Sequence, residues 1–135
     1  MDFVEYISTP ADTTEAEPLV TTLKLTRGRL TGGAVYFPAG PAGTLHVLVR
    51  IAGHQICPFN RGQNLRLNDC VFPLSIGIDI LEPPYQVDIV TWNDSTLYAH
   101  ALTISLQLQP RARKNQTLKQ ILKDMAAEEK AGEKE

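Results

Sequence analysis

The sequence predicts an all-β fold, an antiparallel β-sandwich of seven or eight strands, and two observations carry this prediction. Apolar and polar residues alternate with a period of two in several short segments, of which 98–108 is the longest. Side chains two apart lie on one face of a strand, so each segment predicts a strand with one buried face. Turn-forming residues interrupt these segments roughly every eight to twelve residues, which is typical of a sandwich of jelly-roll or immunoglobulin-like type.

The predicted strands follow one another with no helical pattern between them. Proline residues, which cannot donate a hydrogen bond to a sheet, separate several of them. The last two strands are expected to pair as a hairpin, because the short polar side chains of 93–96 are turn chemistry. Glycines 28, 32 and 33 are expected in turns. The strands are expected at 19–26, 34–37, 44–52, 55–57, 65–72, 74–80, 85–90 and 98–108.

Charge divides the chain into three parts. Residues 1–18 hold five acidic residues and no Lys or Arg, and they are expected to form an extended N-terminal arm. Residues 19–110 are nearly neutral and form the sandwich domain, whereas 111–135 begin with a basic run. The arm opens with an apolar cluster within 3–7 that either folds back on its own core or docks on a neighbouring subunit. The sequence leaves both alternatives open.

The C-terminal part predicts a basic linker and a short amphipathic helix. Thr117 is a suitable N-cap, and Gln120 completes a capping box. The apolar residues that follow recur at helical spacing on one face. A helix this short is marginal alone in water, so its apolar face is expected to lie on the sandwich or on another protein.

Composition excludes several classes of protein. A net charge of -2 and a pI near 5.9 argue against direct nucleic-acid binding by electrostatics. No apolar run approaches the roughly 20 residues of a membrane-spanning helix. The N-terminus lacks the pattern of a signal peptide, so Cys57 and Cys70 are expected as free thiols rather than as a disulfide.

The sequence offers no convincing catalytic or metal-binding set. His46, His54 and His100 come from separate parts of the predicted sandwich and could converge on a metal as in jelly-roll metalloenzymes, but no carboxylate accompanies them at ligand spacing. We expect His100 to be packed and the other two to lie at the surface. Phosphate-binding loops and a Gly-x-Ser-x-Gly nucleophile motif are absent from the sequence. The chain is therefore expected to be no enzyme and to hold no cofactor or metal.

Trp92 lies in the outward register beside the 93–96 turn. Together with other aromatics it is a candidate sugar-stacking platform, but a single exposed aromatic favours a core or interface tryptophan instead. Partner contacts are expected at the two termini and at this turn. The residues expected to make them are Phe3, Val4, Tyr6, Ile7, Trp92, Asn93, Leu118, Ile121, Leu122 and Met125.

The segments Phe37–Val47, Glu82–Tyr85 and Val90–Ser95 give the chain a resemblance to a known group. It resembles the small β-sandwich structural proteins of tailed-bacteriophage virions, of which capsid decoration (cement) proteins are the nearest type. The resemblance implies a homo-oligomer, a trimer above all, that is made in the host cytoplasm and stabilises the capsid surface. Its partners would be the major capsid protein or other virion proteins, contacted by the sandwich and terminal arms. The alternative is a carbohydrate- or receptor-binding module of a phage particle that uses loops 38–43, 58–64 and 93–97.

Overall fold

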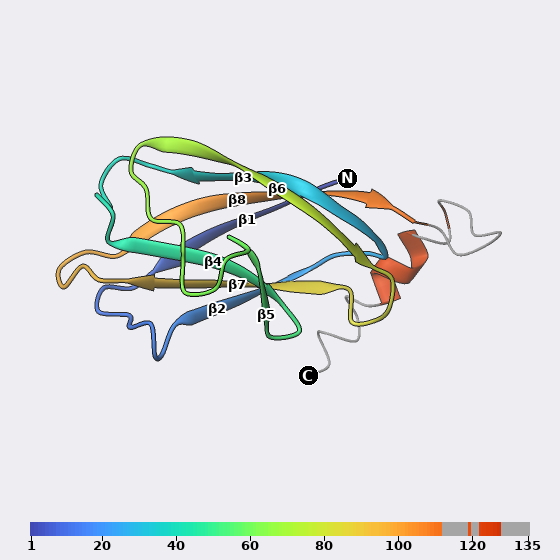
Figure 1. Cartoon of the computed structure of the whole chain (residues 1–135), viewed down its shortest axis with the longest axis horizontal. Coiled ribbons are helices and arrows are strands. Elements are labelled where there is room, and N and C mark those ends of the chain that lie inside the picture. The colour runs from blue at the N-terminus through green and yellow to red at the C-terminus, as the bar shows by residue number, and fades with distance from the viewer. Residues whose placement is uncertain (112–118, 120–121, 128–135) are drawn as a thin grey trace.

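Two antiparallel β-sheets of four strands each pack face to face in the computed structural model, which describes residues 1–111, 119 and 122–127 (Figure 1). The all-β prediction is confirmed. Eight strands lie in this part of the chain. They are β1 (Asp2–Thr9), β2 (Leu19–Lys24), β3 (Gly28–Phe37), β4 (Leu45–Ile51), β5 (His54–Cys57), β6 (Cys70–Ile80), β7 (Gln86–Asn93) and β8 (His100–Pro110).

The chain crosses between the sheets at almost every connection. One sheet has the order β1-β8-β3-β6 and the other β2-β7-β4-β5, so that β4–β5 is the one connection within a sheet among the described strands. The predicted hairpin of the last two strands is therefore wrong. β7 lies between β2 and β4, whereas β8 lies between β1 and β3. Both strands have an apolar face, and each lies in the interior of a different sheet. The apolar faces of the two sheets therefore meet in one core about 10 Å thick.

The N-terminal segment is a strand of the sandwich. Residues 2–9, which the sequence analysis assigned to an arm, pair with β8 along their whole length. Ile7 lies in the core and Phe3 packs against it, so this segment folds back on its own domain. The physical reason is that the buried backbone N–H and C=O groups of β8 need hydrogen-bond partners on both sides. β3 provides them on one side and β1 on the other.

Two strands run through residues that the sequence analysis placed in turns. β3 includes Gly28, Gly32 and Gly33, with a bulge between Leu30 and Gly32. A Cβ on Gly33 would lie 1.9 Å from the carbonyl oxygen of Ser105, so the close approach of β8 requires glycine there. β6 likewise continues through Pro73, which an edge strand tolerates because one side of its backbone is unpaired.

The described part of the C-terminal segment is helical at 122–127. Leu122 is exposed and Met125 is half-buried. Thr117, Leu118, Gln120 and Ile121 lie outside the described residues. Within the described ranges no helix is long and apolar enough to cross a membrane.

Candidate functional surfaces

Four connecting segments meet at one end of the sandwich (Figure 1). The backbone N–H groups of Asp12 and Asp94 donate to the carbonyls of Ser95 and Thr44, at 2.8 and 2.9 Å. The Oδ1 atom of Asn68 accepts from the backbone of the 38–44 loop at two positions. The segments 10–18, 38–44, 58–69 and 94–99 are thus tied together, so the three loops that the sequence singled out, together with 10–18, lie at the same end.

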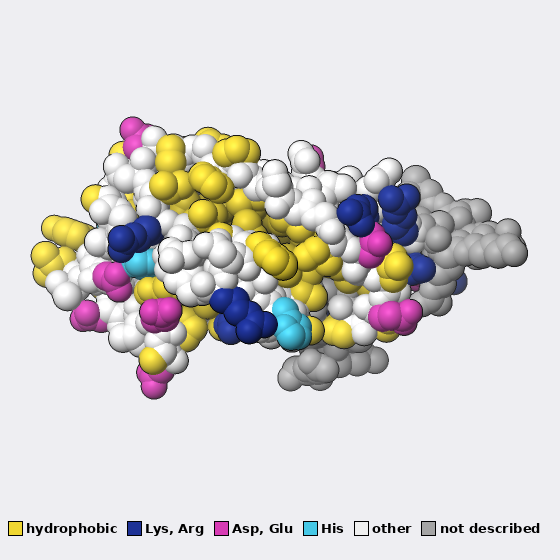
Figure 2. All heavy atoms as spheres, in the orientation of Figure 1, with side chains coloured by type: hydrophobic (Ala, Val, Ile, Leu, Met, Phe, Trp, Pro, Cys, Tyr) yellow, Lys and Arg dark blue, Asp and Glu magenta, His cyan; other side chains and the backbone are white. Residues whose placement is uncertain are grey.

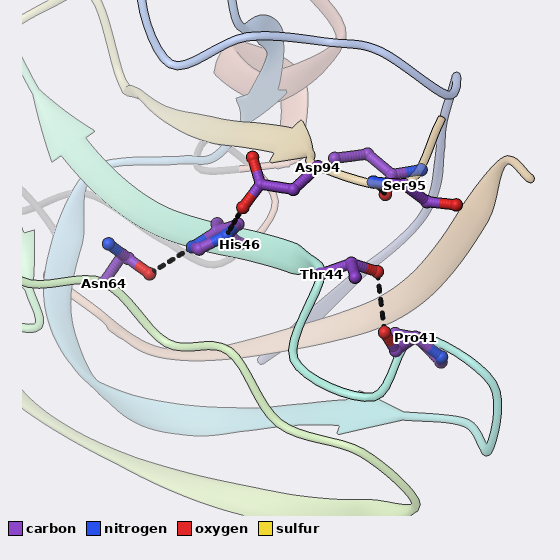
Figure 3. A network of polar contacts seen from close by, with 7 residues as sticks. Pro41, Thr44, His46, Asn64, Asp94 and Ser95 are labelled. Atoms are coloured by element: carbon purple, nitrogen blue, oxygen red, sulfur yellow. Dashed lines mark hydrogen bonds and ion pairs between the residues drawn. The ribbon is translucent and has the colours of Figure 1, made fainter. Parts of the chain in front are cut away.

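His46 is the centre of a polar network at this end (Figure 3). Its side chain points outward from β4, where its Nε2 donates to the Oδ2 of Asp94 at 2.6 Å and its Nδ1 lies 2.7 Å from the Oδ1 of Asn64. The imidazole stacks on the indole of Trp92 with ring centroids 4.9 Å apart and an angle of 7° between the planes. One side chain therefore joins β4, β7 and the 58–69 segment.

This network is a structural clamp. Both ring nitrogens of His46 are hydrogen bonded, and the residue is only 5% exposed, so no nitrogen is open to a substrate or a metal. The prediction that His46 lies at the surface is wrong, because its outward-facing ring is covered by the loops it binds. His100, expected to be packed, is half-buried, and His54 is exposed. Within the described residues no group of three or more His, Cys, Asp or Glu is arranged to hold a metal ion.

Trp92 and Asn93 lie at the end of β7 but are buried. Trp92 is 4% exposed with one ring face against His46, so its indole offers no open platform for stacking a sugar. Asn93 is fully buried, donating from Nδ2 to the carbonyls of Thr9 and Tyr98 and accepting from the backbone N–H of Ser95. These two predicted contact residues therefore hold the loops in place.

The two cysteines are free thiols in the structure, as expected. Cys57 lies on the inner side of β5 and is buried, whereas Cys70 begins β6 and is half-buried. Burial raises the pKa of the Cys57 thiol above its ordinary value of 9.0. A thiol that is harder to ionise is a weaker nucleophile, so Cys57 is placed for packing.

The outer face of the β1-β8-β3-β6 sheet carries an exposed surface without charge. We name it the uncharged face, made of two rows of residues that run across all four strands. On it Tyr6 and Tyr36 are 68% and 46% exposed, and Val4 and Val71 are 60% and 62% exposed. Among the described residues neither tyrosine hydroxyl has a hydrogen-bond partner. The rows are Tyr6–Thr103–Tyr36–Val71 and Val4–Ser105–Ala34–Pro73.

Part of this face was predictable from the sequence and the rest was not. Phe3, Val4, Tyr6 and Ile7 form one apolar cluster in the sequence, but the period of two points Val4 and Tyr6 outward and the other two inward. The same period identifies Tyr36 and Val71 as outward residues of β3 and β6. That they share a row with Tyr6 depends on the strand order, which alternation does not specify.

Comparisons of the chain with models of known protein families, with curated proteins and with solved structures found no match.

Proposed function

We propose that the protein is a non-enzymatic structural protein that assembles through the uncharged face, as a capsid decoration protein of a tailed phage does. The observation that carries the proposal is the pair of uncharged rows on a solvent-facing side of the sandwich. A sheet face that meets only water is normally lined with polar and charged side chains. Protein interfaces, in contrast, are depleted in charge at their centre and enriched in tyrosine.

The geometry of the face supports contact through side chains. Its two tyrosines are large, rigid groups that carry a hydroxyl free to bond a partner, and Thr103 of β8 lies between them in the register. Among the described residues of this sheet the charged ones lie at the margin of the face, where Arg29 pairs with Asp79 at 3.0 Å. An apolar centre with a charged rim is the usual anatomy of an interface.

Edge pairing is a weaker route to assembly. β1 is an edge strand, and Glu5 lies on its inward register opposite Ile104. An inward-pointing charge on an edge strand discourages the addition of a further strand. We therefore assign the subunit contact to the outer face of β1 and not to its edge. Val4 and Tyr6, which were expected to contact a partner from a terminal arm, would make this contact as residues of a sheet strand.

We further propose that the sandwich is a jelly roll rather than an immunoglobulin-like fold. Support comes from the strand orders, in which the first and last strands are neighbours in one sheet and the second and seventh in the other. This pairing of early strands with late strands is typical of a jelly roll, in which eight strands form two Greek keys. As a virion protein, the chain would be made in the host cytoplasm and carried on the capsid surface, with a trimer as the favoured assembly.

The proposal is tested by measuring the molar mass of the purified protein by size-exclusion chromatography with light scattering. We expect the wild type to be an oligomer and a Tyr6→Glu/Tyr36→Glu double variant to be a monomer, because the variant buries charge in the contact. The matched control places two acids on exposed residues of the opposite sheet, Thr22→Glu and Lys24→Glu, and is expected to stay oligomeric. A monomeric wild type at all concentrations, or a double variant that still associates, contradicts the proposal.

A further inference from the structure

An open groove of about 800 Å³ crosses the outer face of the β2-β7-β4-β5 sheet. Val20, Val90 and Leu48 form its apolar floor, and these three residues lie in one register row across β2, β7 and β4. Trp92 lines the same groove one row further along. Four neighbouring strands span about 14 Å, which accommodates about four residues of an extended chain.

Both walls of the groove are held in place by hydrogen bonds. On the β5 side the Nε2 of Gln55 donates to three carbonyl oxygens of the 58–63 loop, at 2.6, 3.3 and 2.9 Å, and this loop carries Arg61. On the β2 side the backbone N–H of Glu17 donates to the Oγ1 of Thr14 at 3.1 Å, which shapes the turn that carries Glu15. A groove with fixed walls loses little conformational entropy when it is filled.

Charge is distributed unevenly around the groove. Arg50, Arg61 and His54 lie at the β4–β5 wall, where Figure 2 shows basic and histidine side chains side by side over β5. Neither arginine has an ion pair with a described residue. Asp88, the register neighbour of Arg50, instead accepts from the hydroxyl of Thr22 at 2.9 Å. The two guanidinium groups are therefore free to bind a carboxylate.

We propose that this groove binds an acidic, extended peptide segment of a partner protein. Apolar side chains of the segment lie on the floor formed by Val20, Leu48 and Val90, and its carboxylates pair with Arg50 and Arg61. A peptide fits better than an acidic sugar, because the floor is aliphatic and the indole of Trp92 is almost fully buried. The inference does not rest on the proposed function, since it concerns the opposite sheet.

Trp92 gives a direct test, because it is the one tryptophan of the chain and lines the groove. The full-length protein is titrated with acetyl-Leu-Val-Glu-Glu-amide and with the reversed sequence, and tryptophan fluorescence is followed. We expect a saturable change that weakens with salt. The variant Arg61→Glu is expected to weaken binding by about tenfold or more, through loss of an ion pair and repulsion of the ligand.

Three controls decide the outcome. Arg66→Glu changes another exposed arginine of the same connecting segment, outside the groove, and is expected to bind within about twofold of the wild type. A peptide with Lys in place of Glu is expected not to bind, and an oligogalacturonate of similar length to bind far more weakly. No saturable change with either acidic peptide, equal binding by the Lys peptide, tighter binding by the sugar, or equal loss in both arginine variants overturns the proposal. Circular dichroism confirms that each variant is folded.

Discussion

The two outer faces of this sandwich are built by the same alternation but differ in the charge that they carry. On the β1-β8-β3-β6 sheet the outward residues at the centre are uncharged, and they are half-buried or exposed. On the β2-β7-β4-β5 sheet the aliphatic floor of the groove is flanked by charged and polar residues, some of which bond across strands, as Lys24 does with Gln86 at 2.9 Å. Loops cover the end of this second face, so that Trp92 and His46 are buried although they point away from the core.

This contrast shows that pointing outward and being exposed are different properties. A strand decides which way a side chain points, whereas the loops decide whether it meets water. Outward residues of the covered end should therefore contribute to stability as core residues do. Outward residues of the uncharged face should contribute little to the stability of the single subunit and matter for contact with others.

The largest difference in stability is expected when one aromatic residue on each face is truncated. Trp92→Ala should lower the free energy of unfolding by about 3–5 kcal/mol, because it empties a buried site. Tyr36→Ala should change it by about 1 kcal/mol or less in the dissociated protein, since this ring is half exposed. Urea denaturation at low protein concentration measures both. Similar losses for the two variants would break the comparison.

A smaller effect is expected from the histidines of the second sheet. His46→Ala should cost about 2–3 kcal/mol, because Asn64 and Asp94 lose their partner and Trp92 loses its stacked ring. The exposed His54 serves as the matched control, and His54→Ala should stay within about 0.5 kcal/mol of the wild type. Thermal or urea unfolding of the two variants at one pH gives the difference. A His46→Ala variant as stable as His54→Ala would show that the clamp contributes nothing.

The smallest effect concerns the cysteines, one on each sheet. In the native protein a thiol reagent should modify Cys70 first, and Cys57 only at the rate of unfolding, because Cys57 is buried. The raised pKa of Cys57 also determines the direction in which the free energy of unfolding changes with pH. Near neutral pH the thiol is protonated in both states, but above about 9 it ionises first in the unfolded chain, so stability falls as pH rises.

The control for the pH effect is Cys57→Ala, whose stability should fall less steeply than that of the wild type between neutral and alkaline pH. Unfolding free energies at several pH values measure both slopes. Equal slopes would contradict the assignment of the pH effect to this thiol.

The sequence predicted the strands well where alternation was strict, as in β8 and β4, because burial of one face imposes a period of two. The prediction from sequence was wrong where backbone geometry, and not the alternation of side chains, determines that a strand continues. The glycines of β3 and Pro73 of β6 were read as breaks, but a bulge and an edge position accommodate them. Part of the uncharged face and the histidine clamp also escaped prediction, since both join residues from distant segments.

The sequence by itself therefore determined the all-β class, the positions of most strands and the inward or outward direction of their side chains. Each of these follows from local stereochemistry and the burial of apolar groups. Tertiary structure alone decided that the last two strands enter different sheets, that residues 2–9 join β8, and that Tyr6 and Tyr36 share a row. The reason is that hydrogen-bonded pairing of strands is non-local, and the same alternation is compatible with many partners until the sandwich closes.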